Sequence, residues 1–266
     1  MSRMRSMYRS PQVVFILLAL VLLAYFLLPL ITFLSRTGTE NIVTGLTSPD
    51  AQQAIRNSLL TAPIATLLAT VCGVPLAYLL ARREFRGKRL VEALVVIPLI
   101  IPPVVGGVMI LTAVGRFTPI GALAASLGVP LTDSLLGVIL AQTFVSAPFV
   151  IITARAGFGA VDVRLEQASR SLGHSQLQTV RSVSIPLASG AILAGILLTF
   201  VRAIGEFGAV MMVAYNPRTM PTRIWVDFIT GGIAGVVPMA LLLLAIALIG
   251  VALIQRLAVM PTVMDR

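Results

Sequence analysis

The sequence predicts an all-α, polytopic membrane protein, and three observations support that prediction. Of the 266 residues, 58% are hydrophobic and only 11% are charged, and the mean hydropathy is +0.99. Soluble domains usually have about 25% charged residues. Six apolar stretches are long enough to cross a hydrocarbon layer, which takes roughly 20 helical residues. The charges between these stretches are distributed unequally along the chain.

The six predicted spans occupy residues 13–34, 58–81, 93–114, 135–154, 187–214 and 233–253. The longest segment between them, residues 155–186, is too short for a further domain, so we expect residues 1–266 to form one membrane domain. The first span follows Arg3, Arg5 and Arg9. It is longer than the apolar region of a signal peptide and no small-x-small cleavage site follows it, so we expect it to be retained.

The third predicted span opens with the residues IPLIIPPVVGG, which include Pro98, Pro102 and Pro103. Because proline lacks an amide hydrogen and blocks regular helical hydrogen bonding, we expect a kinked or interrupted helix there. Two interpretations remain open. The bend either packs against neighbouring helices as a simple kink, or it lines a polar pathway through the membrane.

The net charge of +10 lies almost entirely on one side of the predicted membrane. The N-terminus, the segments 82–92 and 155–186 and the C-terminal tail together have a net charge of +9, whereas the opposite side has +1. Because cytoplasmic segments of membrane proteins are enriched in Lys and Arg, we expect both termini in the cytoplasm. The charge is then explained by topology and membrane lipid, and no basic patch is left that would require a nucleic acid.

The segment 155–186 is predicted to contain two short amphipathic helices. Asp162 can cap the first helix, and Gly173 can end it, because glycine tolerates the left-handed conformation that follows many helices. The residues expected on one apolar face of this helix are Leu165, Ala168 and Leu172. Ser175 and Gln178 have the spacing of a capping box, so a second helix should start directly after Gly173.

We expect the second helix to present Leu177 and Val180 on its apolar side and to end at Pro186. Periodicity leaves the role of the helix pair open. The pair either lies flat on the inner leaflet or serves as a docking surface for a cytoplasmic protein.

The run EQASRSLG, followed by IPLA, resembles the EAA loop of ABC-importer permeases, which is usually Glu-Ala-Ala, three residues and Gly. When the two are aligned on Gly173, the family's glutamate falls on Gln167, and Glu166 lies one residue early. The resemblance implies that this loop binds a cytoplasmic ATPase. The implied coupling residues are Leu165, Glu166, Gln167, Ala168, Ser169, Arg170, Leu172 and Gly173.

The resemblance extends over most of the chain after the first span. The segments 57–94, IPLIIPPVV, GRFTPIGAL and RAIGEFGAV are together similar to the molybdate/tungstate/sulfate branch of these permeases. This implies a type I importer fold, a permease homodimer, two cytoplasmic ATPase subunits and an extracytoplasmic oxyanion-binding protein. MPTRIWVDF resembles the molybdate and tungstate group more than the sulfate/thiosulfate group, which stays the alternative. No GxxxxGK[ST] phosphate loop is present, so ATP hydrolysis is assigned to a separate polypeptide.

The residues RAIGEFG place Arg202 and Glu206 inside the fifth predicted span. A charge at the centre of a membrane helix costs on the order of 2.5–3.5 kcal/mol, so it needs a partner. On one helix the two residues are one turn apart and can neutralise each other. Either the pair locks the helix against its neighbours, or Arg202 offers a transient positive site to a passing dianion.

Two other classes of protein fit the sequence less well. A gradient-driven secondary transporter would need several intramembrane acidic residues, and the spans offer only Glu206. An intramembrane enzyme would need a nucleophile and base or a metal site, but the chain has one histidine, His174, and one cysteine, Cys72. We therefore expect no catalytic site, metal or cofactor. The outer segment 215–232 either contacts the binding protein or holds solvated arginines and the interfacial Trp225.

Overall fold

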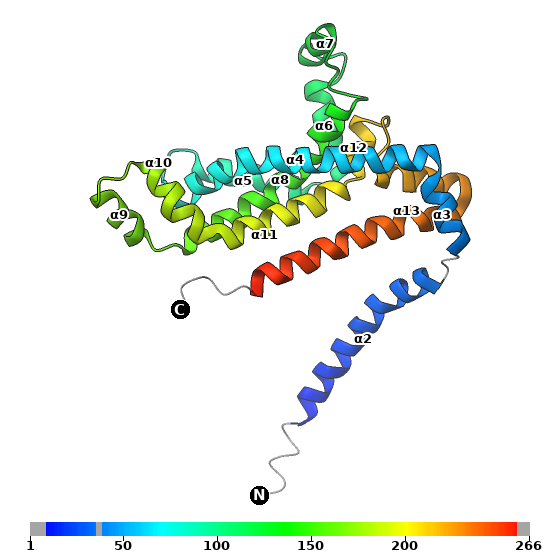
Figure 1. The fold of residues 1–266 in the computed structure, drawn as a ribbon, viewed down its shortest axis with the longest axis horizontal. Coiled ribbons are helices and arrows are strands. Elements are labelled where there is room, and N and C mark those ends of the chain that lie inside the picture. The colour runs from blue at the N-terminus through cyan, green and yellow to red at the C-terminus, as the bar shows by residue number, and fades with distance from the viewer. Residues whose placement is uncertain (1–8, 36–38, 260–266) are drawn as a thin grey trace, which may run out of the picture.

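The structure is a computed structural model that describes residues 9–35 and 39–259, and helices joined by short turns make up this part of the chain (Figure 1). Five helical segments are long and apolar enough to cross a membrane. They are α2 (Arg9–Ser35), α4 (Pro49–Arg82), α8 (Leu135–Ala160), the segment Gln176–Ile204 and α13 (Met220–Val259). The predicted all-α, polytopic architecture is confirmed.

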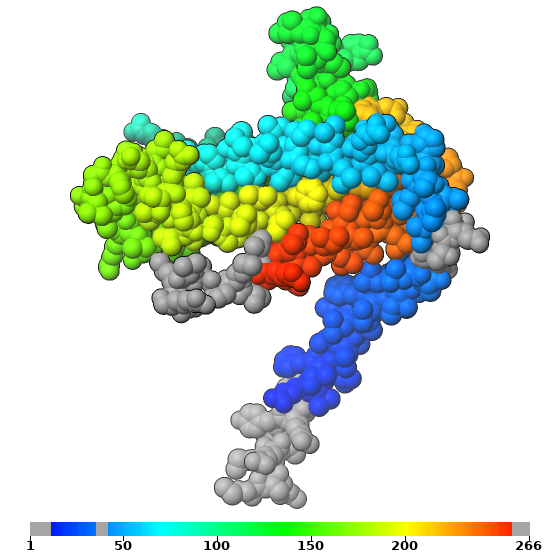
Figure 2. Space-filling model, in the orientation of Figure 1, coloured from blue at the N-terminus to red at the C-terminus, as the bar shows by residue number. Residues whose placement is uncertain are grey.

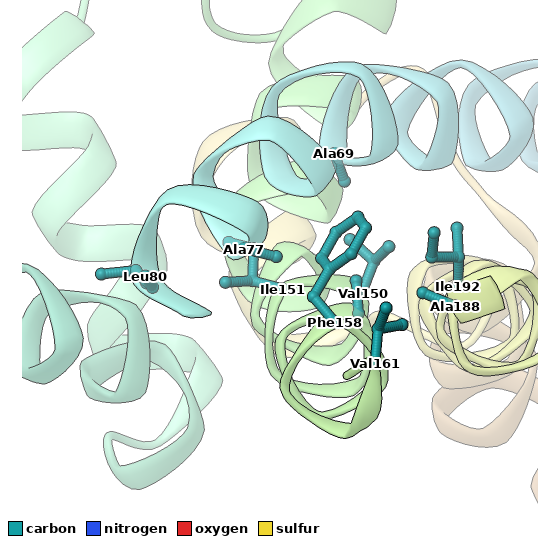
Figure 3. Close-up of a cluster of buried hydrophobic side chains, with 10 residues drawn as sticks. Ala69, Ala77, Leu80, Val150, Ile151, Phe158, Val161, Ala188 and Ile192 are labelled. Atoms are coloured by element: carbon teal, nitrogen blue, oxygen red, sulfur yellow. The ribbon is translucent and has the colours of Figure 1, made fainter. Parts of the chain in front are cut away.

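Three of the long helices, α4, α8 and α11 (Ile185–Ile204), form the centre of the bundle (Figure 1). Figure 3 shows Phe158 of α8 between the alanines of α4 and Ile192 of α11. Small side chains let these helices approach closely, as is usual in membranes where no hydrophobic force drives helices together. A Cβ atom added to Gly157 would lie 2.5 Å from the Cβ atom of Ala191.

The third predicted span is interrupted, as the proline pattern indicates. It consists of α5 (Lys88–Ile100) and α6 (Pro103–Val114), which are bent by 119° relative to each other. Pro102 and Pro103 lie at the break, whereas Pro98 lies inside α5 and does not interrupt it. The pair is a broken span or a re-entrant loop, and a short helix, α7 (Pro119–Ser126), follows it.

The fifth span differs from the prediction at both ends. Helix α10 (Gln176–Thr179) continues through a π-helical turn, η1 (Val180–Ser184), into α11, so the expected end at Pro186 is wrong. In the π-helical turn, Ile185 N donates to Val180 O five residues earlier. The wider turn leaves room for a proline ring that would clash inside a regular helix. At the other end α11 stops at Ile204, and a separate helix, α12 (Gly208–Val213), follows.

The sixth span begins earlier than expected. Helix α13 includes residues 220–231, which the sequence assigned to an outer loop, and it changes direction at Gly232, whose φ is +62°. Only glycine adopts this backbone conformation at little cost. A short helix, α3 (Thr39–Thr47), connects α2 to the bundle. The outer segment is therefore folded against the bundle and is not an extended loop.

Helix α2 projects away from the bundle, and α6 and α7 project from the opposite side (Figures 1 and 2). No residue of the most apolar part of α2 is buried. A helix that is apolar on all sides must be covered by lipid or by another protein chain. The protein is therefore a multi-pass membrane protein whose first helix has no cover within the described bundle. Arg3 and Arg5, which the charge argument used, lie outside the described residues.

Candidate functional site

The segment 155–186, which we call the paired-helix loop, has the capping contacts that its sequence indicates. Helix α9 (Val163–Ser171) starts at Asp162, whose Oδ1 accepts from Arg164 N at 2.9 Å. Gly173 has a φ of +89° and turns the chain into α10. The capping box forms as predicted, since Ser175 N donates to Gln178 Oε1 at 2.7 Å and Ser175 Oγ accepts from Gln178 N.

The apolar face of α9 is exposed and lies beside the start of the adjoining membrane helix. Leu165 and Ala168 are exposed, and 81% of Leu172 is accessible to solvent. These side chains line an open cavity of about 520 Å³ together with Val183 and Leu187 of the adjoining helix. An exposed apolar surface of this kind on a short, rigidly held helix is typical of a helix that docks into a groove of a partner.

The buried face of α9 is polar and fixes the loop to the end of α4. Glu166 is only 4% exposed, and its Oε1 atom lies 2.9 Å from Arg82 Nε. Ser184 Oγ donates to the same oxygen at 2.8 Å, and Arg82 Nη2 donates to Val161 O at 2.7 Å. This Glu166–Arg82 ion pair, with Ser184 and Val161, connects α4, the α8–α9 turn, α9 and η1. We call these four residues the brace.

A second contact connects α9 to α10. Ser169 is buried, and its Oγ atom lies 3.1 Å from Thr179 Oγ1 and 3.0 Å from His174 Nδ1. Gln167, on which alignment at Gly173 placed the family's glutamate, is exposed. The buried carboxylate is therefore that of Glu166, one residue earlier. Sequence reasoning missed Arg82 and Ser184, because they are 84 and 18 residues away and no local pattern indicates them.

The intramembrane pair forms, but with a different backbone from the one expected. Arg202 lies on the last turn of α11, whereas Glu206 lies in the break between α11 and α12. Arg202 Nη1 is 2.5 Å from Glu206 Oε2. The other carboxylate oxygen accepts from Ala209 N at 2.8 Å and so caps α12. The prediction that both residues lie on one helix is wrong, because α11 ends at Ile204 and α12 begins at Gly208, so Glu206 lies between the two helices.

The pair is unequally exposed. Glu206 is 1% exposed, whereas the side chain of Arg202 is 29% exposed. The ion pair is close, but it does not have the angles of a hydrogen bond, and Glu206 Oε2 accepts none within the described part of the chain. One carboxylate is thus held inside the protein, and its arginine reaches towards the surface.

The structure brings the proline bend and the charged pair together. A Cβ atom added to Gly208, two residues after Glu206, would lie 3.1 Å from the Cβ atom of Pro103. A Cβ atom added to Gly107 of α6 would lie 2.9 Å from Ala209 Cα. The start of α6 therefore packs directly on the first turn of α12. Pro98 lies before the break, inside α5.

Gln142 of α8 is a buried polar residue that sequence reasoning did not find. It is fully buried, and neither its Nε2 nor its Oε1 atom has a hydrogen-bond partner among the described residues. Ile139, three residues earlier on α8, belongs to the same buried cluster as Ala203 and Ile204 of α11. The sequence of α8 alone does not indicate whether a glutamine among apolar residues is buried in the bundle or exposed.

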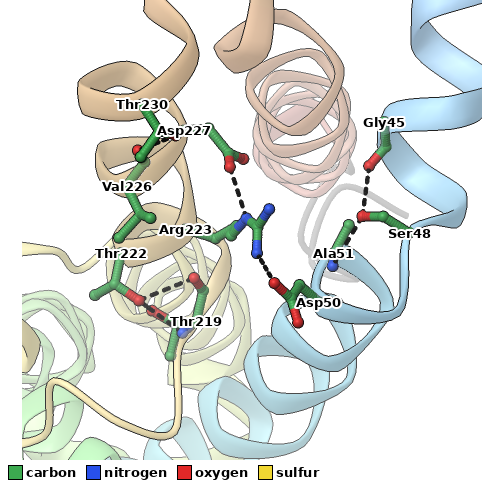
Figure 4. A network of polar contacts seen from close by, with 10 residues as sticks. All are labelled: Gly45, Ser48, Asp50, Ala51, Thr219, Thr222, Arg223, Val226, Asp227 and Thr230. Atoms are coloured by element: carbon green, nitrogen blue, oxygen red, sulfur yellow. Dashed lines mark hydrogen bonds and ion pairs between the residues drawn. The ribbon is translucent and has the colours of Figure 1, made fainter.

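At the end of the bundle opposite α9, Arg223 connects α13 to α4 (Figures 1 and 4). Its Nη1 atom lies 2.6 Å from Asp50 Oδ2, and its Nε atom lies 2.7 Å from Asp227 Oδ1. Trp225 packs against Phe207, with 5.8 Å between the ring centroids. Arg223 is therefore an ion-paired residue and not the solvated arginine that was one of the two expectations.

The bundle, the broken span and the paired-helix loop define a multi-pass transport subunit, and known proteins agree with this class. The family model described as "binding-protein-dependent transport system inner membrane component" matches residues 73–259. The chain therefore belongs to this family of binding-protein-dependent transport permeases. The resemblance found in the sequence is confirmed, and membership of this family identifies a transport subunit.

Three relatives cover most of the chain. A probable molybdenum ABC transporter permease of Haloferax volcanii is 46% identical over 92% of this chain and 90% of its own length. The molybdate/tungstate permease WtpB of Pyrococcus abyssi is 38% identical over 88% and 90%. The molybdenum permease ModB of Escherichia coli is 34% identical over 80% and 95%.

Solved structures show the same fold. A chain of a bacterial alginate ABC transporter, solved with an alginate-bound periplasmic protein, superposes with a TM-score of 0.71. The superposition covers 96% of this chain and 98% of that one at 17% sequence identity. A chain of the MetNI methionine transporter gives a TM-score of 0.58. The fold is that of ABC-importer permeases.

Proposed function

We propose that this protein is the membrane-spanning permease of an ATP-driven importer that carries molybdate or tungstate into the cell. The observation that carries the proposal is the 46% identity, over nine-tenths of both chains, to a permease named for molybdenum. The relatives in Pyrococcus abyssi and Escherichia coli are named for the same group of anions. Sulfate or thiosulfate is the substrate that an experiment must exclude.

The α9 end of the bundle is proposed to face the cytoplasm and to receive a separate ATPase subunit. Charge supports this orientation, because the segments at this end are rich in arginine. The exposed apolar face of Leu165, Ala168 and Leu172 supports docking in a groove of the ATPase, since an isolated apolar helix face is otherwise unfavourable in water. The brace holds this helix on α4, so that movement of the ATPase moves a membrane helix.

The importer is proposed to contain two copies of this permease and an extracytoplasmic binding protein. The apolar surface of α2, which is not covered within the described bundle, is available to pack against the second copy or to face lipid. The outer end, where Arg223 connects Asp50 and Asp227, is the proposed face for the binding protein (Figure 4). Both termini then lie in the cytoplasm.

The route of the anion is proposed to pass the contact between α6 and α12. Pro102 and Pro103 set the bend, and Glu206 holds both Arg202 and the start of α12. The carboxylate of Glu206 would repel a dianion, so Arg202 can attract one only when the pair separates. The pair is therefore proposed to close the route at rest.

Reconstitution tests the substrate. The permease, its ATPase and its binding protein are placed in vesicles, and ATP turnover is measured with molybdate, tungstate, sulfate or no anion. Stimulation by molybdate or tungstate at low anion concentration, without stimulation by sulfate at the same concentration, is expected. Stimulation by sulfate alone would reject the assigned anion but keep the importer, whereas turnover that ignores every anion would reject the importer.

A further inference from the structure

Two cavities adjoin at the α9 end of the bundle, between α4 and the continuous helix that begins at α10. They share Tyr78 and Gln176. The first has a volume of about 180 Å³, and its lining includes Arg82, Arg83 and Arg170. The second has a volume of about 610 Å³ and is mostly apolar. A charged cavity thus continues directly into an apolar one.

The charged cavity has more positive groups than its own carboxylate can neutralise. Glu166 is paired with Arg82. Arg83 donates to the neutral Gln176 at 2.9 Å, and Arg170 donates to a backbone carbonyl at 3.4 Å. Arg181 lines the adjoining cavity. Among the described residues, none of these last three arginines has a carboxylate partner.

The apolar cavity lies where lipid chains would be. It is lined by Val74 and Leu79 on the last turns of α4, and by Leu177, Val180 and Ile185 on the facing helix. The charged cavity lies at Arg82 and Arg83, where α4 ends. Val74 and Arg82 are eight residues apart, which is about 12 Å along a helix. Half of a hydrocarbon layer is about 15 Å thick, so the distance from Arg82 to Val74 fits within one leaflet.

We propose that an anionic phospholipid of the inner leaflet binds in these two cavities. Its phosphate lies against Arg83 and Arg170, and an acyl chain follows Leu79 and Leu177 into the apolar cavity. Basic pockets between membrane helices on the cytoplasmic side suit such headgroups. The proposal rests on the proposed function only for its orientation, with α9 in the cytoplasm.

A second copy of this chain does not match the charge of this surface. The acidic residues described near this end are Glu84, Glu92, Asp162 and Glu166. Three of them are already ion-paired, and Asp162 caps α9. A partner copy would therefore bring no free carboxylate from this region, whereas an anionic lipid supplies the missing charge and fills the apolar cavity as well.

Lipid binding to the purified permease–ATPase complex tests the proposal. Native mass spectrometry or lipid extraction compares phosphatidylglycerol with phosphatidylcholine bound to wild type and to Arg83→Gln/Arg170→Gln. The matched control is Arg86→Gln/Arg89→Gln, which removes two nearby charges that do not line these two cavities. We expect phosphatidylglycerol to bind the first variant roughly tenfold or more weakly and the control as wild type.

Equal retention of phosphatidylglycerol by the two variants, or equal binding of both lipids to wild type, would overturn the proposal. Inorganic phosphate is added as a separate probe. If phosphate binds at Arg83 and fully displaces the lipid, the site is one for a free anion and the lipid proposal is overturned. If Leu177→Ser leaves phosphatidylglycerol binding unchanged, the acyl-chain assignment is overturned. Uptake is measured separately after the wild-type complex is reconstituted into vesicles, so that a failed lipid site with intact uptake leaves the proposed function standing.

Discussion

The brace makes a quantitative prediction about Glu166→Gln. Glu166 Oε1 accepts from both Arg82 and Ser184, and the Arg82 and Glu166 side chains are only 9% and 5% exposed. Removing one partner of a buried ion pair typically costs about 3–5 kcal/mol. Glutamine keeps an acceptor oxygen but leaves the guanidinium uncompensated, so the lower value applies. At 1.4 kcal/mol per factor of ten, opening of α9 should become about a hundredfold more frequent.

Hydrogen exchange of the backbone amides in α9, measured on the reconstituted complex, reports this opening directly. The control is Glu84→Gln, which breaks the Lys88 pair, whose glutamate side chain is 89% exposed. Exposed pairs contribute little, so the control should exchange as wild type. Arg82→Gln/Glu166→Gln removes both charges and should recover most of the loss. Exchange in Glu166→Gln within a few-fold of the Glu84→Gln control would refute the brace.

Three further substitutions test other parts of the molecule. Glu206→Gln leaves Arg202 uncompensated and should cut uptake at least several-fold while the complex still assembles, and near-normal uptake would reject a coupled pair. Gly173→Ala forces a side chain to a φ of +89°, so it should lower the stability of the loop by about 1–2 kcal/mol and weaken ATPase retention in pull-down. The control is Gly159→Ala, where an added Cβ atom meets open space, and it should retain the ATPase as wild type does. Gln142→Leu removes two buried polar atoms without partners among the described residues, so it should raise the thermal midpoint of unfolding. The expected gain in the free energy of unfolding is about 1–3 kcal/mol. A lowered midpoint would contradict this and would mean that Gln142 has a hydrogen-bond partner.

The sequence correctly predicted the features that are determined by the properties of a single continuous segment of the chain. The long spans follow from apolar length, the break at Pro102 follows from the missing amide hydrogen, and Gly173 and the Ser175 capping box follow from backbone preferences at helix ends. Each of these features depends on residues within a few positions of one another. The sequence contained the whole signal.

The other features depend on contacts between distant segments. Arg82 and Glu166 are 84 residues apart, so neither residue indicates the other. The break at Glu206 lies in an apolar run without proline, and its stabilising contacts come from Ala209 and from α6. Pro186 was expected to end a helix, but a π-helical turn next to it accommodates the ring. In these places tertiary contacts determine the structure, and the conformational preferences of neighbouring residues do not reveal it.

We propose that a separate ATPase drives this permease through α9, and uptake into sealed vesicles is the decisive test of this mechanism. Labelled molybdate or tungstate is supplied outside with the binding protein, and the permease and ATPase are reconstituted with ATP enclosed inside. This mechanism predicts accumulation of the anion that requires both the ATPase and internal ATP and that is lost in Leu172→Asp, which charges the exposed apolar face. Accumulation by the permease alone under a proton or sodium gradient, or uptake unchanged in Leu172→Asp, would contradict it.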